Sequence, residues 1–150
     1  VISADQMLEA AESAFKSVDA AILTAAVADY TPVICADHKL KKEHEPLVEI
    51  KLKETTDILA TLAAQKRDRV VVGFAAETDN LLQNAQAKLE RKGVDMIVAN
   101  DVSRADSTFG ADTDRVAFVS KTGIEQLETL PLVAVANAVL DKTVQLLKAR

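Results

Sequence analysis

Two lysines four residues apart, Lys88 and Lys92, are the side chains in this sequence best arranged to bind an anion. Residues 79–92 predict a helix with one apolar face. That face is formed by Leu81, Leu82, Ala85 and Leu89. Lys92 projects within the same arc and Lys88 lies at its edge, although a like-charge pair at this spacing costs about 0.2–0.5 kcal/mol in an isolated helix. An anion between the two ammonium groups would explain the arrangement. The arrangement is equally explained if the aliphatic parts of the two lysine side chains cover the core while their ammonium groups stay in water.

Polar side chains also follow three predicted buried strands, at the point where each strand ends. They are Asp29, Glu77 and the pair Asn100 and Asp101. In open parallel sheets, ligands bind just beyond the carboxyl ends of the strands, so the set as a whole favours a site on that edge. Taken singly, each residue has the simpler role of carrying the chain out into solvent.

The irregular segment 33–46 carries three lysines, Lys39, Lys41 and Lys42. A flexible basic loop can close over a phosphorylated ligand, exclude water and add positive charge. The alternative is a solvated loop whose lysines are neutralised by neighbouring glutamates.

A predicted helix start at Thr55 or Thr56 offers one more place for an anion or a ribose. Asp57 falls in its first turn, and Ile58 and Leu59 begin its apolar face. Free N–H groups and the helix dipole favour oxygen ligands there. Plain capping by threonine and aspartate explains the same residues.

Several other chemistries are excluded. Cys35, Asp37, His38 and His44 lack the paired spacing of zinc ligands. No serine lies in a G-x-S-x-G elbow, and neither histidine has a nucleophile partner. The remaining chemistry is electrostatic, with lysines acting on a phosphate-bearing substrate, alone or with a metal ion.

Alternating helices and strands must position these groups. Helices are predicted from a capping box at Ser3 and Gln6, from Thr55 or Thr56, over 79–92 up to Gly93, and from Pro131 with Val135, Val139, Leu140 and Leu147 on its apolar side. Strands are predicted over 20–28, 48–53, 70–76, 96–99, 116–119 and 124–127, with a polar connection over 102–114. The order indicates one Rossmann-like α/β domain, with a mostly parallel sheet flanked by helices and an antiparallel C-terminal edge.

Composition narrows the function further. The chain has 150 residues, 49% of them hydrophobic, which suits one globular domain. Its four isolated glycines cannot form a G-x-G-x-x-G or a P-loop motif, and its few aromatics argue against a base-stacking platform. A net charge of −5 argues against nucleic acid and anionic membrane as partners. With one cysteine, Cys35, and no signal-peptide or membrane-spanning pattern, a cytoplasmic location is expected.

Five strings and the lysine pair stand in a fixed order along the chain. They are AAVADYTP at 25–32, KLKK at 39–42, TDIL at 56–59, GFAAET at 73–78, Lys88 with Lys92 and Gly93, and DMIVAND at 95–101. Together they resemble bacterial phosphopantothenoylcysteine synthetase, the ligase half of the bifunctional coenzyme A biosynthesis protein. The resemblance covers nearly the whole chain and is densest over 20–109.

The resemblance implies a two-step ligation. 4′-Phosphopantothenate would react with CTP and Mg²⁺ to give an acyl-cytidylate and pyrophosphate. The amine of cysteine would then displace CMP. The resemblance also implies a homodimer, and FMN only if a decarboxylase is fused upstream. The absence of a protein nucleophile agrees with this scheme.

The resemblance further implies a role for each matching residue. Ala25, Ala26 and Asp29 would contact the nucleotide; Thr56, Asp57, Ile58 and Leu59 would hold the cytidine; Phe74 would line its pocket; and Lys88 and Lys92 would bind phosphates. Lys39 would be the catalytic residue on a mobile flap, and Asp29 the metal ligand. Thr56 stands where the family often has proline, and we expect the backbone contact to survive.

One departure from the family pattern is large. The family begins with a strand, a G-G-T turn and an Asn-x-Ser-Ser-Gly segment that bind phosphates, and this sequence contains none of them. Residues 1–150 therefore match the C-terminal two-thirds of a single ligase domain. We expect this polypeptide alone to bind nucleotide poorly and not to turn over.

Two other functions stay open. One is a non-catalytic module that mainly dimerises, and the other is a different nucleotide-dependent α/β enzyme, such as a dehydrogenase. The ligase requires Lys39, Lys88 and Lys92 to converge on one rim with Asp29, which distinguishes it from a dimerisation module.

Overall fold

The structure is a computed structural model that describes residues 1–44, 48–103 and 110–150. Part of the predicted basic loop (45–47) and part of the predicted polar connection (104–109) lie outside the described residues. The helices are α1 (Ala4–Phe15), α2 (Ile58–Ala64), α3 (Leu81–Lys92) and α4 (Leu132–Lys148). The main strands are β1 (Ala20–Leu23), β4 (Val70–Glu77), β5 (Met96–Asp101), β7 (Val116–Ser120) and β8 (Gly123–Gln126).

The five main strands form one sheet in the order β1-β4-β5-β7-β8. β1, β4 and β5 run parallel, whereas β7 and β8 pair antiparallel at the other edge. Two small antiparallel pairs, β2 (Tyr30–Pro32) with β3 (Leu52–Glu54) and β6 (Thr113–Asp114) with β9 (Leu130–Pro131), complete the described strands. The predicted α/β class and its antiparallel C-terminal edge are confirmed.

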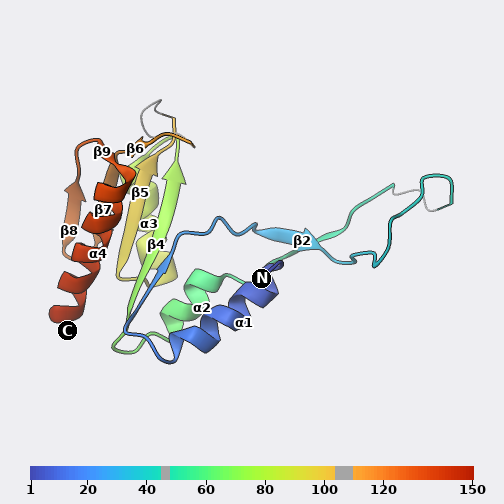
Figure 1. The fold of residues 1–150 in the computed structure, drawn as a ribbon, viewed down its shortest axis with the longest axis horizontal. Helices are drawn as coiled ribbons and strands as arrows, with labels where there is room; N and C mark the ends of the chain where they lie inside the picture. The colour runs from blue at the N-terminus through green and yellow to red at the C-terminus, as the bar shows by residue number, and fades with distance from the viewer. Residues whose placement is uncertain (45–47, 104–109) are drawn as a thin grey trace.

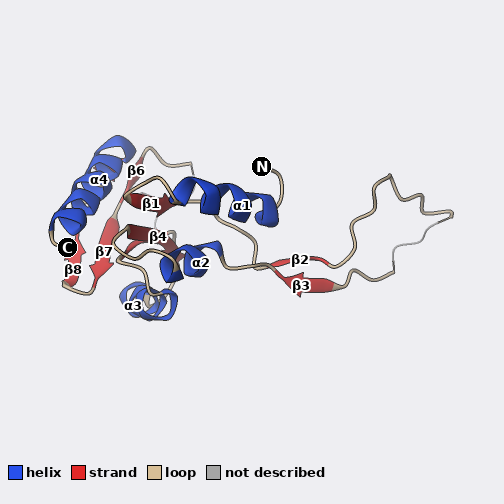
Figure 2. Cartoon of the chain, turned by 90° about the horizontal axis from the view of Figure 1, so that it is seen from below, coloured by secondary structure: helices blue, strands red, loops and turns tan. Residues whose placement is uncertain are grey.

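Helices cover both faces of the sheet, so the central strands are apolar on both sides. Figure 2 shows α3 on one side of the sheet and α4 on the other. The first core joins α1, α2 and α3 to the sheet through Phe15, Leu62, Ala85, Val71 and Ile97. The second joins α4 to the sheet through Val135, Val139, Val72, Val98 and Phe118. None of the helices in the described ranges is long and apolar enough to cross a membrane.

Local signals in the sequence set several element boundaries. The capping box at Ser3 and Gln6 starts α1, as predicted. α3 ends at Gly93, whose left-handed φ of 66° suits a residue without a side chain. Pro131 precedes the first residue of α4.

The prediction of a strand over 20–28 is wrong beyond Leu23. Pairing with β4 ends at Leu23, opposite Gly73, and the chain then leaves the sheet. Residues 24–28 are exposed, and β1 itself is only half-buried because it is the edge strand among the described residues. The strand prediction is therefore correct only over residues 20–23, where β4 runs beside the chain.

The predicted strand over 48–53 is also reduced, to the three residues of β3. Its side chains are all exposed, because neither core contains a residue of this hairpin. Figure 1 shows the hairpin on an arm that extends away from the sheet. A period-two pattern produces a half-buried strand only where another layer of the fold covers the apolar face of that strand.

Two details of the predicted helices are corrected. The residue that caps α2 is Asp57, not Thr55 or Thr56. Leu140 does not belong to the buried side of α4 and is 53% exposed. The buried residues of α4 are Val135, Val139 and Thr143, which are spaced four residues apart and face the sheet. Leu140 is one residue after Val139 and therefore lies about 100° further around the helix.

Candidate functional site

A cleft of about 620 Å³ opens at the carboxyl end of β1, where the chain leaves the sheet. The loop after β1, the junction between β3 and α2, the middle of β4, the last turns of α3 and one side of α1 form its walls. The cleft therefore lies where an edge strand stops while its parallel neighbour continues. This is a position at which α/β sheets commonly bind ligands.

Lys88 extends from α3 to the middle of β4. Its Nζ donates a hydrogen bond to the backbone oxygen of Phe74, at 2.7 Å. Burial lowers the pKa of the Lys88 ammonium below its ordinary value of 10.5, and the nearby carboxylate of Glu77 only partly opposes this shift. A poorly solvated ammonium at the cleft wall is well placed to gain from an anionic ligand.

Lys92, one turn further along α3, forms an ion pair with Asp57. Asp57 also caps α2, because its Oδ1 accepts a hydrogen bond from the N–H of Ala60 at 2.9 Å. Burial alone would raise the pKa of Asp57. The hydrogen bonds from Lys92 and Ala60, with the charges of Lys92 and Lys88, outweigh burial and leave that pKa below its ordinary value of 3.8. One carboxylate thus links the start of α2 to the end of α3.

Thr55 holds together the two chain segments at the base of the arm. Its backbone N–H donates to the oxygen of Asp29 at 2.9 Å, and its Oγ1 donates to the oxygen of Ala28. These bonds fix the loop after β1 beside the start of α2, so Asp29 and Thr56 both border the cleft. Sequence patterns do not distinguish Thr55 from Thr56 as the anchoring residue.

The structure gathers most of the predicted site residues around this cleft. Those that line it are Ala25, Asp29, Thr56, Asp57, Ile58, Leu59, Phe74, Lys88 and Lys92. Ala26 is exposed and does not line it. Lys39 lies on the exposed arm and does not line it either. The expected convergence therefore holds for Lys88, Lys92 and Asp29, but not for Lys39 in this arrangement of the chain.

The other predicted strand-end carboxylates, Glu77 and Asp101, do not line the cleft, although Glu77 is close enough to Lys88 to act on its pKa. Glu77 and Asp101 are partners across β4 and β5. Glu77 accepts a hydrogen bond from Asn84 at 2.9 Å, and Asp101 accepts two from Ser103. Both carboxylates thus have local hydrogen-bond partners at the ends of their strands.

Sequence reasoning missed several residues that line the cleft. Among them are Thr24, Tyr30, Glu54 and Thr55, together with Met7 and Ala11 of α1. Tyr30 lies within one of the recognised strings, and Thr24, Glu54 and Thr55 lie within two residues of one, so the strings were a usable signal for them. Met7 and Ala11 carried only an amphipathic helix pattern, which does not distinguish a cleft wall from a core.

Comparison with known protein families shows which family this chain belongs to. The model of the DNA/pantothenate metabolism flavoprotein C-terminal domain family matches residues 1–147. The chain belongs to this family. The coenzyme A biosynthesis bifunctional protein CoaBC of Bacillus subtilis (strain 168) is 46% identical over 123 residues, which are 82% of this chain and 30% of that protein. A cysteine/cysteine sulfinic acid decarboxylase from an unknown prokaryotic organism is 40% identical over 148 residues, 97% of this chain and 41% of that protein.

A crystal structure shares the fold of this flavoprotein C-terminal domain. It is the C-terminal domain of a coenzyme A biosynthesis bifunctional protein CoaBC, with a TM-score of 0.79 and 35% identity. The match covers all of this chain and 65% of the other. The chain thus spans less than half the length of the two curated relatives above and about two-thirds of the crystallised domain. The family resemblance drawn from the sequence strings is confirmed.

The contact between Asp57 and Lys92 gives this family domain a testable electrostatic property. We expect the Asp57→Asn variant to bind inorganic pyrophosphate about two- to five-fold more tightly than the unaltered protein. The reason is that the carboxylate of Asp57 no longer competes with pyrophosphate for Lys92, while asparagine still caps the helix. Isothermal titration measures the affinity. Asp68→Asn, an exposed change in the turn before β4, is the matched control and should leave the affinity unchanged.

The same variant should alter stability at acid pH. The lowered pKa of Asp57 means that its charged form stabilises the folded state at neutral pH, and that this contribution is lost as the pH falls below 3.8. The unfolding free energy of Asp57→Asn should therefore fall less than that of the unaltered protein between about pH 5 and pH 2. Equal pyrophosphate affinities and parallel acid curves would show that the ion pair has no energetic role.

Proposed function

We propose that this domain forms the nucleotide-binding part of a CTP-dependent ligase, which joins 4′-phosphopantothenate to cysteine in coenzyme A biosynthesis. The observation that carries the proposal is the cleft itself, in which two lysines from α3 face an aspartate and an aromatic wall. The family membership and the CoaBC relatives support the same activity.

In the proposed reaction, a carboxylate oxygen of 4′-phosphopantothenate attacks the α-phosphorus of CTP, and pyrophosphate leaves with the bonding electron pair. The amine of cysteine then attacks the acyl carbon, loses a proton and releases CMP. Lys88 and Lys92 would bind the phosphates and stabilise the charge that develops on pyrophosphate. The segment 56–59 and Phe74 would hold the cytidine.

Asp29 is the candidate ligand for Mg²⁺. It borders the cleft, whereas the carboxylate of Asp57 is already engaged by Lys92. The described residues contain no group of three acidic, histidine or cysteine side chains that could hold a metal ion. Proteins often bind Mg²⁺ through one or two carboxylates together with substrate phosphates, so Asp29 and the phosphates of CTP would hold the ion together. When bound, it would neutralise charge on the triphosphate.

Activity of the longer protein tests the proposal. Pyrophosphate release should require both CTP and 4′-phosphopantothenate, and formation of the amide should also require cysteine. ATP in place of CTP tests the choice of base. Pyrophosphate release without the acid substrate, or no release at all, would contradict the proposed ligation.

Residues 1–150 by themselves should be inactive. We expect this polypeptide to bind CTP much more weakly than the longer protein and to release no pyrophosphate, because the resemblance places other phosphate-binding segments outside it. Titration of both proteins with CTP, and the coupled pyrophosphate assay, measure the difference. Full CTP-dependent ligation by residues 1–150 would contradict this expectation.

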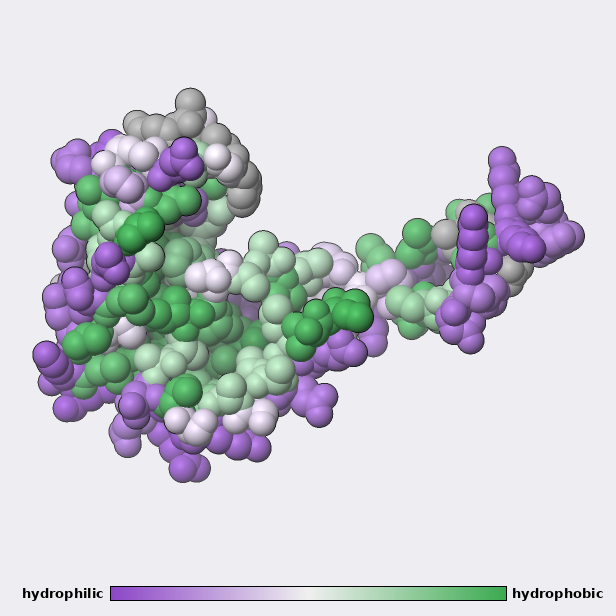
Figure 3. All heavy atoms as spheres, in the orientation of Figure 1, coloured by the Kyte–Doolittle hydropathy of each residue, from purple (hydrophilic) through white to green (hydrophobic). Residues whose placement is uncertain are grey.

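We also propose that the protein is a homodimer that associates through the arm. Val33, Ile34, Val48, Ile50 and Leu52 leave between 51% and 94% of their surface exposed along it. Figure 3 shows apolar residues along the arm and hydrophilic ones at its far end. An exposed apolar hairpin of this kind marks an interaction surface. Lys39 is on the same arm, so its proposed catalytic role requires the arm to close or a second copy to supply the lysine. Sedimentation equilibrium of the longer protein tests the association.

A further inference from the structure

Gly73 occupies a point of unusually close approach between a strand and a helix. A Cβ atom at this position would lie 2.6 Å from Cδ2 of Leu59, 3.1 Å from its Cδ1 and 3.2 Å from Cδ1 of Ile97. Carbon atoms in ordinary contact lie about 3.5–4.0 Å apart. Gly73 is not among the glycines with positive φ, so its backbone would accept alanine. The restriction is therefore one of space.

Leu59 connects this close approach to the cleft. It lies in the first turn of α2, directly after the buried residue Ile58 and two residues after the capping residue Asp57. Its side chain is half-buried and lines the cleft. Because β4 lies beneath it, a Leu59 side chain that is pushed off the strand must move toward the cleft.

Two lysine contacts depend on the same small region. Lys88 donates to the backbone oxygen of Phe74, the residue after Gly73. Lys92 pairs with Asp57, at the start of the helix that Leu59 anchors. The depth at which the first turn of α2 rests on β4 thus affects both the space in the cleft and the position of one of its charges.

We propose that Gly73 is a positioning residue for nucleotide binding. The absence of a side chain lets Leu59 rest against β4, which keeps the first turn of α2 out of the nucleotide's space. The inference rests on the proposed function, because it takes the occupant of the cleft to be a nucleotide.

The experiment is a double-mutant cycle in the longer protein. Gly73→Ala should raise the Kd for CTP roughly ten-fold or more, as expected for overpacking at a site that cannot relax freely. In a Leu59→Ala background the same substitution should change the Kd less than about two-fold, because the overlapping atoms are gone. Equal effects of Gly73→Ala in the two backgrounds would overturn the proposal.

Gly123→Ala is the matched control. It is the same change at a residue with φ of 136° and no atom within 4 Å of the added Cβ, so it strains the β7–β8 turn and leaves the cleft alone. It should lower stability with little effect on the Kd. If it weakens CTP binding as much as Gly73→Ala does, the effect is one of general stability and the proposal fails.

A ligand-free measurement separates this inference from the proposed function. Amide hydrogen exchange at Ala60, whose N–H bonds to Asp57, should speed up in Gly73→Ala and return in Gly73→Ala/Leu59→Ala to the rate of Leu59→Ala alone. If the unaltered protein does not bind CTP, the proposed function fails while this result still supports the positioning role. Unchanged exchange in Gly73→Ala would refute that role whatever the ligand.

Discussion

Replacing Lys88 or Lys92 by alanine should weaken CTP binding by the longer protein by about 10- to 100-fold for each lysine. This range corresponds to the roughly 1.5–3 kcal/mol typical of hydrogen bonds to charged groups. Both side chains border the cleft, and no more than half of either is in contact with solvent. Each ammonium is therefore poorly hydrated, and competition from water weakens its interaction with a phosphate only slightly. Isothermal titration with CTP and with cytidine separates the phosphate contribution from that of the base. Cytidine affinity should change little.

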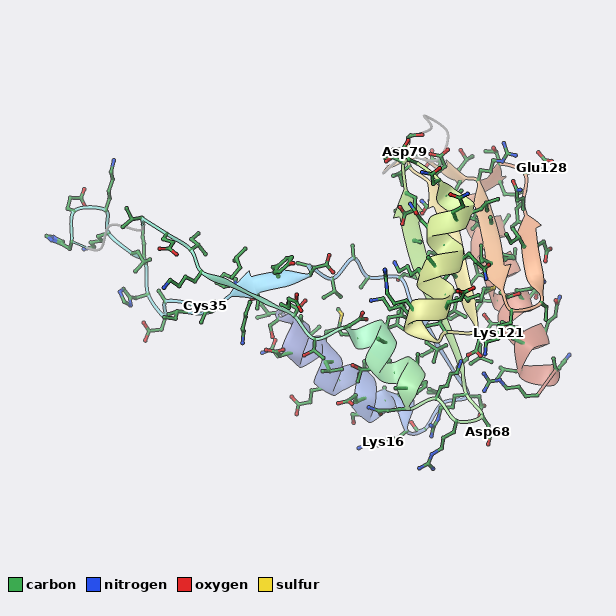
Figure 4. The ribbon with its side chains drawn as sticks, turned by 180° about the vertical axis from the view of Figure 1, so that it is seen from behind. Lys16, Cys35, Asp68, Asp79, Lys121 and Glu128 are labelled. Atoms are coloured by element: carbon green, nitrogen blue, oxygen red, sulfur yellow. The ribbon has the colours of Figure 1, made fainter. Side chains whose placement is uncertain are left out.

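Lys121→Ala is the matched control for this pair. Lys121 is an exposed residue of the β7–β8 turn, and Figure 4 shows it at the opposite end of the sheet from Asp79. CTP affinity should not change in this variant beyond a small non-specific effect. If Lys88→Ala and Lys92→Ala also leave the affinity unchanged, the assignment of the phosphates to these lysines is wrong.

Burial adds a pH signature to the Lys88 result. Because its pKa lies below the ordinary value of 10.5, Lys88 loses its charge at a lower pH than an exposed lysine. CTP affinity should therefore decline on the alkaline side before a typical lysine would titrate. Lys88→Arg should shift that decline to higher pH, since arginine stays charged throughout the range.

Replacing Asp95 by alanine should lower the unfolding free energy by roughly 2–4 kcal/mol, because it removes the shared partner of a mostly buried polar cluster. Asp95 Oδ1 accepts from Lys66 at 2.9 Å and from Arg150 at 2.6 Å, and Oδ2 accepts from the N–H of Val71 at 2.8 Å. The Asp95 side chain is only 14% exposed. These bonds join the start of β4, the residue before β5, Lys66 and Arg150.

Chemical denaturation of the longer protein measures this loss. Asp68→Ala, an exposed change in the turn before β4, should cost less than about 0.5 kcal/mol. Asp95→Asn should lie between the two, because an amide oxygen can still accept from Val71 while the charge is gone. A loss for Asp95→Ala no greater than that for Asp68→Ala would mean that the cluster does not stabilise the fold.

The strands of the sheet show how much of the fold can be predicted from sequence patterns and where such prediction stops. The run at 70–76 predicted a buried strand, and β4 is that strand, because helices cover both of its faces. The equally apolar run at 20–28 predicted the same and produced only the four residues of β1. Hydrophobicity shows that a segment favours burial, but whether a neighbouring strand continues beside it depends on residues far away in the chain.

The candidate site divides in the same way. Helical spacing alone placed Lys88 and Lys92 at the margin of a buried face, and the structure puts both at the cleft. The spacing could not show that Asp57 neutralises one of them and the backbone of Phe74 holds the other. Those partners are 35 and 14 residues away, and only the packing of α2 and α3 against β4 brings them into reach.

By itself the sequence determined the α/β class and the order of the elements through local periodicity and capping residues. Its contiguous strings determined the family and, through the resemblance, half of the residues that line the cleft. The tertiary structure decided which groups share a space. It placed Lys39 on an arm outside the cleft, gave Glu77 and Asp101 local partners, and showed that Gly73 is needed for room rather than for its backbone angles. Such facts depend on distances between segments remote in the chain, and no pattern within one segment encodes them.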